Sequence, residues 1–328
     1  MTRSTSNQPL DRRSFVKTLG GASALAALGG NSLAAGLFSG PTPDSAAETV
    51  VTEFYKSLSD SQKGEICFGF NHELRKRINA NWNITKPEIG DSFYTDKQRT
   101  LIDQIVRGIT SEDGYKVLKH QMADDSGSID AYSVAIFGKP GQGDFQFELT
   151  GRHLTMRADG NSVKNTAFGG PIVYGHGIDE AKENLFYNQT LQTNKVFQAL
   201  DAGQAKKALV NTRIPRETAV QLQGEGGTFA GIGVDELTDD QKKLVTETLQ
   251  YLVSPYREED RKEVMEIVKQ GGGIEALHMA FYQKADLDSD RIWDVWRVEG
   301  PSFVWHFRGA PHVHAYINIG AAAAANRG

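Results

Sequence analysis

The chain contains the segment Thr95-Asp96-Lys97-Gln98-Arg99-Thr100-Leu101, and a second version, Thr238-Asp239-Asp240-Gln241-Lys242-Lys243-Leu244, follows 143 residues later. In each version a threonine stands three residues before a glutamine, which is the spacing of a capping box at a helix N-terminus. Apolar residues recur at helical spacing behind both boxes: Leu101, Ile102, Ile105 and Val106, then Leu244, Val245, Leu249 and Leu252. The sequence therefore predicts two equivalent helices.

Further matches extend this similarity in the same order along the chain. They pair Leu58…Gln62 with Leu200…Gln204, Ile129-Asp130-Ala131 with Ile274-Glu275-Ala276, and Gly151 with Gly300. Ordered matches at slowly growing offsets are typical of an internal duplication. We therefore predict two copies of one unit, about 48–175 and 176–320, related by a pseudo-twofold axis.

Each predicted unit has helices first and strands afterwards. The helices are expected near 46–60, 95–106 and 113–123, and near 180–200, 238–252 and 257–270. The strands are expected at 131–138 and 145–156, and at 276–284, 292–298 and 302–307. Runs of helix followed by runs of strand favour an α+β fold with antiparallel sheets, each unit ending in a β-hairpin.

The N-terminus carries an export signal. Arg12 and Arg13 are followed by a polar residue and then by Phe15, which matches the twin-arginine consensus. A weakly apolar, glycine-rich stretch follows and ends in small residues at Ser32-Leu33-Ala34. We predict a twin-arginine signal peptide over 1–35, with the Tat translocase as export partner and a periplasmic or extracellular destination.

The predicted domain boundaries follow from this signal. Residues 36–47 are expected to be a linker, 48–320 a single domain and 321–328 a disordered tail. The signal stretch is interrupted by glycines, and no later stretch has the roughly 20 apolar residues of a membrane helix. We therefore expect no stable membrane span.

The composition is that of an ordinary globular protein, with 39% hydrophobic and 23% charged residues. A net charge of −5 argues against nucleic acid as a partner. Cys67 is the single cysteine, so neither an intramolecular disulfide nor a cysteine-based zinc ribbon can form. We interpret Cys67 as a buried structural thiol.

Histidines provide the candidate chemistry. His312 and His314 alternate on the last predicted strand, so their side chains share one face and can converge on a metal ion. His153 lies in the first copy, just after Gly151, which we expect to form a bulge that redirects the strand. Because the second copy has Ser302 where the first has His153, the predicted ligands come from opposite copies.

Other groups complete this candidate site. Glu148 is a candidate general base or fourth ligand, and His306 and His176 are further candidate ligands. Three histidines and a carboxylate suit zinc, copper, iron or manganese, and the ligand types do not choose among these divalent metals.

A crowd of aromatic residues offers a second type of site. It consists of Trp293, Trp296, Phe303, Trp305 and Phe307. We expect a core cluster here, although rings that faced a groove could stack on a small molecule.

Four landmarks, in order, carry a resemblance to a known family. They are Phe137-Gly138-Lys139-Pro140-Gly141, Phe147–Leu154, Gly300-Pro301-Ser302-Phe303 and His312-Val313-His314. The chain resembles the DUF3500 family over nearly all of the predicted domain, and this resemblance implies a domain but no activity. It also implies Gly-His-His where this chain has Gly151-Arg152-His153, and Arg-Asp shortly after His-x-His, where Ala315-Tyr316 follows here.

Two functional hypotheses remain, beside a purely structural role. The first is an exported metal-dependent enzyme, a hydrolase or an oxidoreductase that acts on a small molecule. The second is a non-catalytic envelope protein that binds a small molecule or a partner in an aromatic cleft.

Overall fold

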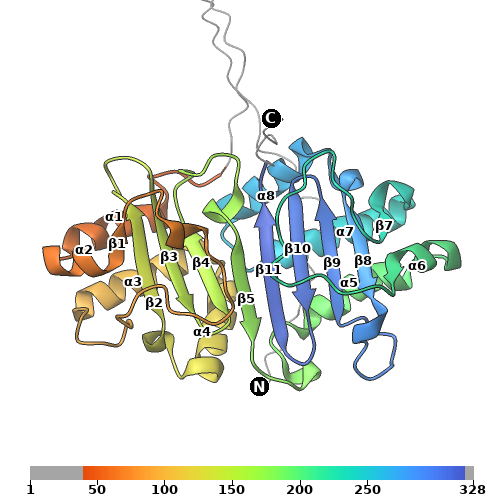
Figure 1. The fold of residues 1–328 in the computed structure, drawn as a ribbon, viewed down its shortest axis with the longest axis horizontal. Coiled ribbons are helices and arrows are strands. Elements are labelled where there is room, and N and C mark those ends of the chain that lie inside the picture. Colours follow the sequence, from red (N-terminus) through yellow and green to blue (C-terminus); the bar gives the residue numbers. More distant parts are fainter. Residues whose placement is uncertain (1–39, 322–328) are drawn as a thin grey trace, which may run out of the picture. The chain divides into compact units, whose positions relative to one another are not determined.

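The computed structural model describes residues 40–321, which contain eight α-helices and eleven strands (Figure 1). The helices are α1 Ala46–Ser57, α2 Asp60–Ile66, α3 Asp96–Ile109, α4 Glu112–Ser126, α5 Tyr187–Gln198, α6 Ala202–Ala208, α7 Asp239–Val253 and α8 Glu258–Gln270. The strands are β1 Cys67–Phe68, β2 Ser133–Gly138, β3 Phe145–Gly151, β4 Leu154–Ala158, β5 Ile172–His176, β6 Leu209–Val210, β7 Ile232–Gly233, β8 His278–Tyr282, β9 Val295–Gly300, β10 Phe303–Arg308 and β11 Val313–Ile319. The predicted α+β class is confirmed.

All strands belong to one mixed sheet, in the order β1-β2-β3-β4-β5-β11-β10-β9-β8-β6, with β7 paired to β8. The predicted antiparallel pairing holds from β2 to β8, but β1 pairs with β2 and β6 pairs with β8 in parallel. Where antiparallel sheets were predicted, the structure therefore has one mixed sheet. The two groups of strands join edge to edge through β5 and β11, which leaves one continuous sheet.

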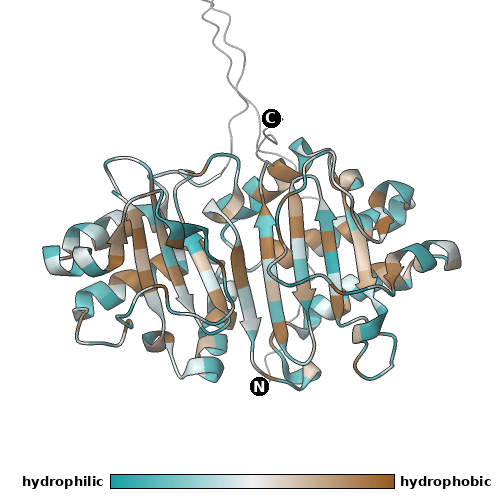
Figure 2. Ribbon diagram, in the orientation of Figure 1, coloured by the Kyte–Doolittle hydropathy of each residue, from teal (hydrophilic) through white to brown (hydrophobic). Residues whose placement is uncertain are grey.

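The two faces of the sheet have different covers. The main apolar core lies between the sheet and the helices, and it includes side chains of α1, α3, α7 and α8. Smaller apolar clusters on the other face contact the segments around Ala80 and Val220, which cross the strands in front of the sheet (Figure 1). Hydrophobic residues are accordingly concentrated on the strands, while the helices carry many hydrophilic ones (Figure 2).

Both predicted capping boxes form, at the start of α3 and of α7. Each box glutamine also binds a preceding helix: Gln98 Nε2 donates to the Ser57 carbonyl at 3.0 Å, and Gln241 Nε2 donates to the Ala199 carbonyl at 2.7 Å. In each half, one glutamine therefore caps the N-terminus of a helix and also hydrogen-bonds the end of the preceding helix. This double role accounts for the similar segments that begin at Thr95 and Thr238.

The predicted signal peptide, with Arg12, Arg13 and Phe15, and residues 322–328 of the predicted tail lie outside the described residues. Helix α1 begins at Ala46, so the last two residues of the predicted linker 36–47 are helical. Within 40–321, no helix has the length and apolar character needed to cross a bilayer.

Candidate metal centre

His153 lies in the tight turn between β3 and β4. Gly151 pairs with Leu154, so only Arg152 and His153 connect the two strands, and His153 takes a left-handed conformation with φ of 56°. The prediction of one strand over 145–156 with a bulge at Gly151 was therefore wrong. The chain reverses direction here and forms two strands joined by a tight turn. The backbone N–H of His153 donates to the Ala80 carbonyl, which attaches the turn to the covering segment.

Gly151 is required by a close approach. A Cβ atom at this position would lie 2.1 Å from Cδ1 of Tyr132, so any larger residue would displace the ring or the turn. The hydroxyl of Tyr132 donates to the Arg152 carbonyl at 2.9 Å. The glycine therefore lets a tyrosine ring support the turn that presents His153.

His312 and His314 come from the other half of the chain. His314 lies near the start of β11, and its partner across the sheet is Gly175 on β5. A Cβ atom on Gly175 would lie 3.3 Å from Cβ of His153. The missing side chain on β5 thus leaves room for His153, presented from the turn between β3 and β4, to reach across to β11.

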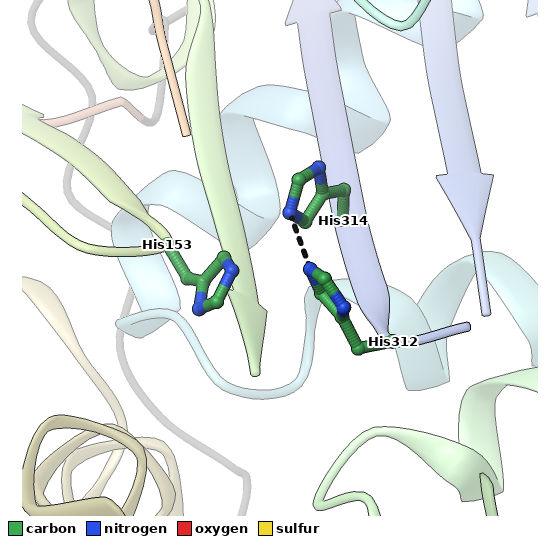
Figure 3. A group of neighbouring side chains, drawn as sticks. All are labelled: His153, His312 and His314. Carbon is green, nitrogen blue, oxygen red and sulfur yellow. Dashed lines mark hydrogen bonds between the residues drawn. The ribbon is translucent and has the colours of Figure 1, made fainter. Parts of the chain in front are cut away.

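The three histidines converge beside the paired strands β5 and β11, in the middle of the sheet (Figure 3). One nitrogen of each ring lies within 4.8 Å of a nitrogen of the other two. The ring centroids of His153 lie 5.1 Å from His312 and 5.0 Å from His314, and the latter two are 4.9 Å apart. Nε2 of His312 and Nε2 of His314 are 3.1 Å apart. The rings therefore form a nearly equilateral triangle.

Each ring also contacts a carboxylate through its Nδ1 atom. The distances are 2.7 Å from His153 to Asp125, 3.1 Å from His312 to Asp179 and 2.8 Å from His314 to Glu217. A carboxylate that accepts from Nδ1–H fixes the tautomer with a free Nε2 lone pair, which is the usual arrangement of a metal-binding histidine. None of these three carboxylates was among the residues predicted from the sequence.

The environment keeps these groups in the charge states that metal binding requires. Burial lowers the pKa of His312 and His314, and the neighbouring Arg308 charge lowers both further, which favours neutral imidazole. Burial acts to raise the pKa of Asp125, but hydrogen bonds from His153, Gln121 and the Gly177 amide bring it below its ordinary value. Asp125 is therefore a buried, ionised partner.

Glu217 has a similar balance. Burial acts to raise its pKa, whereas the hydrogen bond to His314 and the charge of Arg308 bring it below the ordinary value. Nη1 of Arg308 lies 2.8 Å from the Glu217 carboxylate. The guanidinium thus holds Glu217 against His314.

The structure does not bring Glu148 to the three histidines. It lies on β3 before the turn, fully buried, and its carboxylate faces Arg157 on β4 at 3.4 Å. Burial raises its pKa to about 7, against the opposing charge of Arg157. Glu148 faces Arg157 and is not part of the histidine group, so it supplies neither a ligand nor a base to this group.

Two other predicted candidates also lie apart. His306 is fully buried on β10, two residues from Arg308, and among the described residues neither ring nitrogen has a hydrogen-bond partner. His176 accepts from the Leu185 amide with Nδ1 and donates to Asp124 with Nε2 at 2.9 Å, so both nitrogens are occupied. Neither belongs to the triangle.

The aromatic crowd is part of the core. Trp296, Phe303, Trp305 and Phe307 are fully buried, and Trp293 is 4% exposed. Trp296 and Phe307 stack with ring centroids 4.7 Å apart. The rings are occupied with one another, so they offer no open aromatic face. Cys67 is half-buried, and burial raises the pKa of its thiol to about 11, which fits a structural residue.

Comparison with known proteins identifies a family whose description names no activity. Neither the curated proteins nor the solved structures contain a match to this chain. The family described as "Protein of unknown function (DUF3500)" matches residues 41–319, which include every residue of the histidine triangle and its three carboxylates. The chain therefore belongs to the DUF3500 family.

Proposed function

We propose that His153, His312 and His314 bind one divalent transition-metal ion and that the protein is a metal-dependent enzyme. The observation that carries this proposal is the pairing of every ring with its own carboxylate while one nitrogen of each ring turns toward the other two. Histidines that meet by chance in a fold rarely share such a set of supporting partners.

The arrangement suits catalysis better than a purely structural site. Three protein ligands leave a coordination position for water or substrate, whereas structural zinc sites are closed by four. His312 and His314 are both partly exposed, so the histidine triangle lies next to solvent. A bound zinc ion would activate water for hydrolysis, and copper, iron or manganese would supply redox chemistry.

We also infer that the two halves arose by duplication and that the site formed only once. The strand order supports this, since β1 to β5 is followed by β11 back to β6, with a parallel pair at each edge. The two glutamine-centred helix starts support it as well. Ser302 occupies the position equivalent to His153, so the second half lacks the first ligand of the set.

Export through the twin-arginine route completes the proposal. Arg12, Arg13 and Phe15 support it, and this route carries folded proteins, which allows a metal to be inserted before transport. Replacing Arg12 and Arg13 with lysine should retain the full-length precursor in the cytoplasm, as seen by fractionation and immunoblotting. Unchanged export of that variant would overturn this part and leave the metal site untouched.

The metal site is tested by elemental analysis. The protein is expressed with its own predicted signal peptide and purified from the exported fraction without chelators or a polyhistidine tag. Its metal content is then measured by plasma mass spectrometry. We expect close to one equivalent of a transition metal in the wild type and almost none in the His312→Ala/His314→Ala double variant.

A matched control is His72→Ala. His72 is an exposed histidine outside the triangle, so its loss should leave the metal content unchanged. A wild-type protein without metal, which also fails to bind added zinc, copper, iron or manganese, would sink the proposal.

A further inference from the structure

Arg152 is the first residue of the two-residue turn that presents His153, and the turn uses only its backbone. The Arg152 carbonyl accepts from the Tyr132 hydroxyl at 2.9 Å and from Nε2 of Gln121 at 3.2 Å. The backbone also forms a bridge with Asn81. The side chain is 47% exposed, and its guanidinium donates no hydrogen bond within residues 40–321. The fold therefore leaves this side chain free for another role.

The guanidinium of Arg152 has an acidic neighbour but no close ion pair. Its Nε atom lies 3.8 Å from Oδ1 of Asp125, which is beyond hydrogen-bond distance. The Asp125 carboxylate already accepts from His153, from Gln121 and from the Gly177 amide. These three donors use most of its acceptor capacity. The N–H groups of Arg152 therefore remain available to an acceptor from outside the protein.

The guanidinium lies beside the ring of His153, and Gly177 shows how closely the two approach. A Cβ atom on Gly177 would lie 3.2 Å from Nη2 of Arg152 and 3.1 Å from Cε1 of His153. It would also lie 2.6 Å from Oδ1 of Asp125, so the missing side chain lets all three groups meet. Cε1 is bonded to Nε2, the nitrogen of His153 that Asp125 leaves free. The positive charge of Arg152 is therefore a neighbour of the proposed metal ligand.

The formal charges of the candidate metal centre balance without Arg152. A divalent ion contributes two positive charges and Arg308 contributes one, and the three carboxylates paired with the neutral imidazoles contribute three negative charges. The neighbouring Asp124 contacts His176 and His120 instead. Arg152 is thus the charge without a counterion, and a ligand with one negative charge would complete the balance.

We infer that Arg152 sets the substrate class of the proposed enzyme, by binding the carboxylate of a small monoanionic substrate whose reacting group lies at the metal. A guanidinium holds a carboxylate through two parallel N–H···O hydrogen bonds, which fix both its position and its orientation. An anchor away from the reacting atoms orients a substrate for the chemical step. A phosphate group carries nearly two charges near neutral pH and would exceed the single unbalanced charge. The inference rests on the proposed metal site.

The test uses hydroxamic acids, which chelate a protein-bound metal through the hydroxamate group. They are compared in pairs whose other end carries either a carboxylate or the isosteric carboxamide, over a series of spacer lengths. Isothermal titration calorimetry gives the dissociation constants for protein loaded with the metal that elemental analysis identifies. In the wild type, at least one spacer length should favour the carboxylate roughly tenfold. That factor is the low end for a hydrogen bond to a charged group, because the guanidinium is half-exposed.

Three variants connect this preference to Arg152. Arg152→Gln should bind both members of each pair equally and keep its metal, because the side chain is not a ligand. Arg152→Lys keeps the charge but loses the paired N–H groups, so it should keep part of the preference. Arg99→Gln is the matched control. Arg99 contacts Asp91 and Asp96 near the start of α3, so the loss of its charge should leave the preference intact.

The metal content of every sample is measured, so the two proposals fail in different ways. A protein that takes up no metal overturns the proposed metal site and this inference with it. A metal-loaded wild type without a preference for the carboxylate at any spacer length overturns the inference alone, and so does an Arg152→Gln variant that keeps the preference. Tighter binding of the corresponding phosphonates by the wild type would overturn the choice of a carboxylate.

Discussion

Asp125 Oδ2 lies 2.7 Å from Nδ1 of His153, although 28 residues separate them in the chain. Asp125 stands in the last turn of α4, where the helix dipole disfavours a negative charge. The backbone amide of Gly177 donates to its other oxygen at 2.9 Å. A carboxylate kept in an unfavourable helical position by contacts to a histidine and a distant amide has a role outside its own helix.

Asp125→Asn tests this role. Asparagine has no charge and a single acceptor oxygen for the three donors that reach Asp125, namely His153 Nδ1, Gln121 Nε2 and the Gly177 amide. The His153 ring would therefore be held less firmly and would lose part of its basicity. We expect a roughly 10- to 100-fold weaker metal affinity, measured by chelator competition, with little change in far-UV circular dichroism. Asp103→Asn is the control, since Asp103 binds Tyr115 and Lys119 away from the histidines. Equal affinities for wild type and Asp125→Asn would remove Asp125 from the site.

Gly151→Ala tests the support of the turn. Its Cβ atom would lie 2.1 Å from Tyr132 Cδ1, so the ring or the turn must move. We expect the free energy of unfolding to fall by about 1–3 kcal/mol and metal affinity to fall with it. Gly64→Ala is the contrasting control: nothing lies within 4 Å of its added Cβ atom in α2, so a stability gain of up to about 1 kcal/mol is expected. Denaturant unfolding of both variants compares them directly, and an unaffected Gly151→Ala protein would contradict this account.

The helices were predictable where a local sequence signal coincided with the apolar spacing of a face that packs on the core. The capping box of Thr95 and Gln98 marks the start of α3 within four residues, and the same type of box marks the start of α7. The joining of the two halves into one sheet was not predictable, because β5–β11 pairing depends on contacts between residues about 140 positions apart. The two-residue edge strands β1 and β6 are too short to show any periodicity.

The site was predictable only in its ligands. His312 and His314 share a strand face, and that local rule sufficed to pair them. Asp125, Asp179 and Glu217 were not predicted. Acidic residues in loops and at helix ends are usually exposed, and no sequence pattern distinguishes those that contact a distant histidine. Glu148 is a predicted ligand or base because it is close to His153 in the sequence. The turn after Gly151 separates the two side chains in the structure.

His306→Phe tests the pH dependence of stability. Burial, together with the nearby Arg297 charge, lowers the pKa of His306 to about 4, from an ordinary value of 6.5. As the pH falls from 6.5 to 4, the unfolded chain therefore takes up a proton that the folded chain refuses, and stability falls by up to roughly 3 kcal/mol. Phenylalanine has no such proton and leaves no unpaired ring nitrogen. We expect the variant to resist unfolding better than the wild type at pH 5 and to differ less at pH 8. A parallel loss of stability in both proteins below pH 6 would exclude His306 as a cause.

Glu263→Gln should have the opposite pH signature. Burial raises the pKa of Glu263 to about 8, and the negative charges of Asp260 and Asp159 raise it too, against the lowering effect of Arg257. The folded state keeps this proton while the unfolded state releases it near the ordinary value of 4.5, so stability falls as the pH rises from about 4.5 to 8. Glutamine stays neutral throughout. Thermal unfolding of Glu263→Gln should therefore show a gain of roughly 4 kcal/mol at pH 8 and less than about 1 kcal/mol at pH 5. Glu258→Gln, on the exposed side of the same helix, serves as the control and should show no such trend. A gain of the same size at both pH values would mean that Glu263 is ionised, or neutral, in both states.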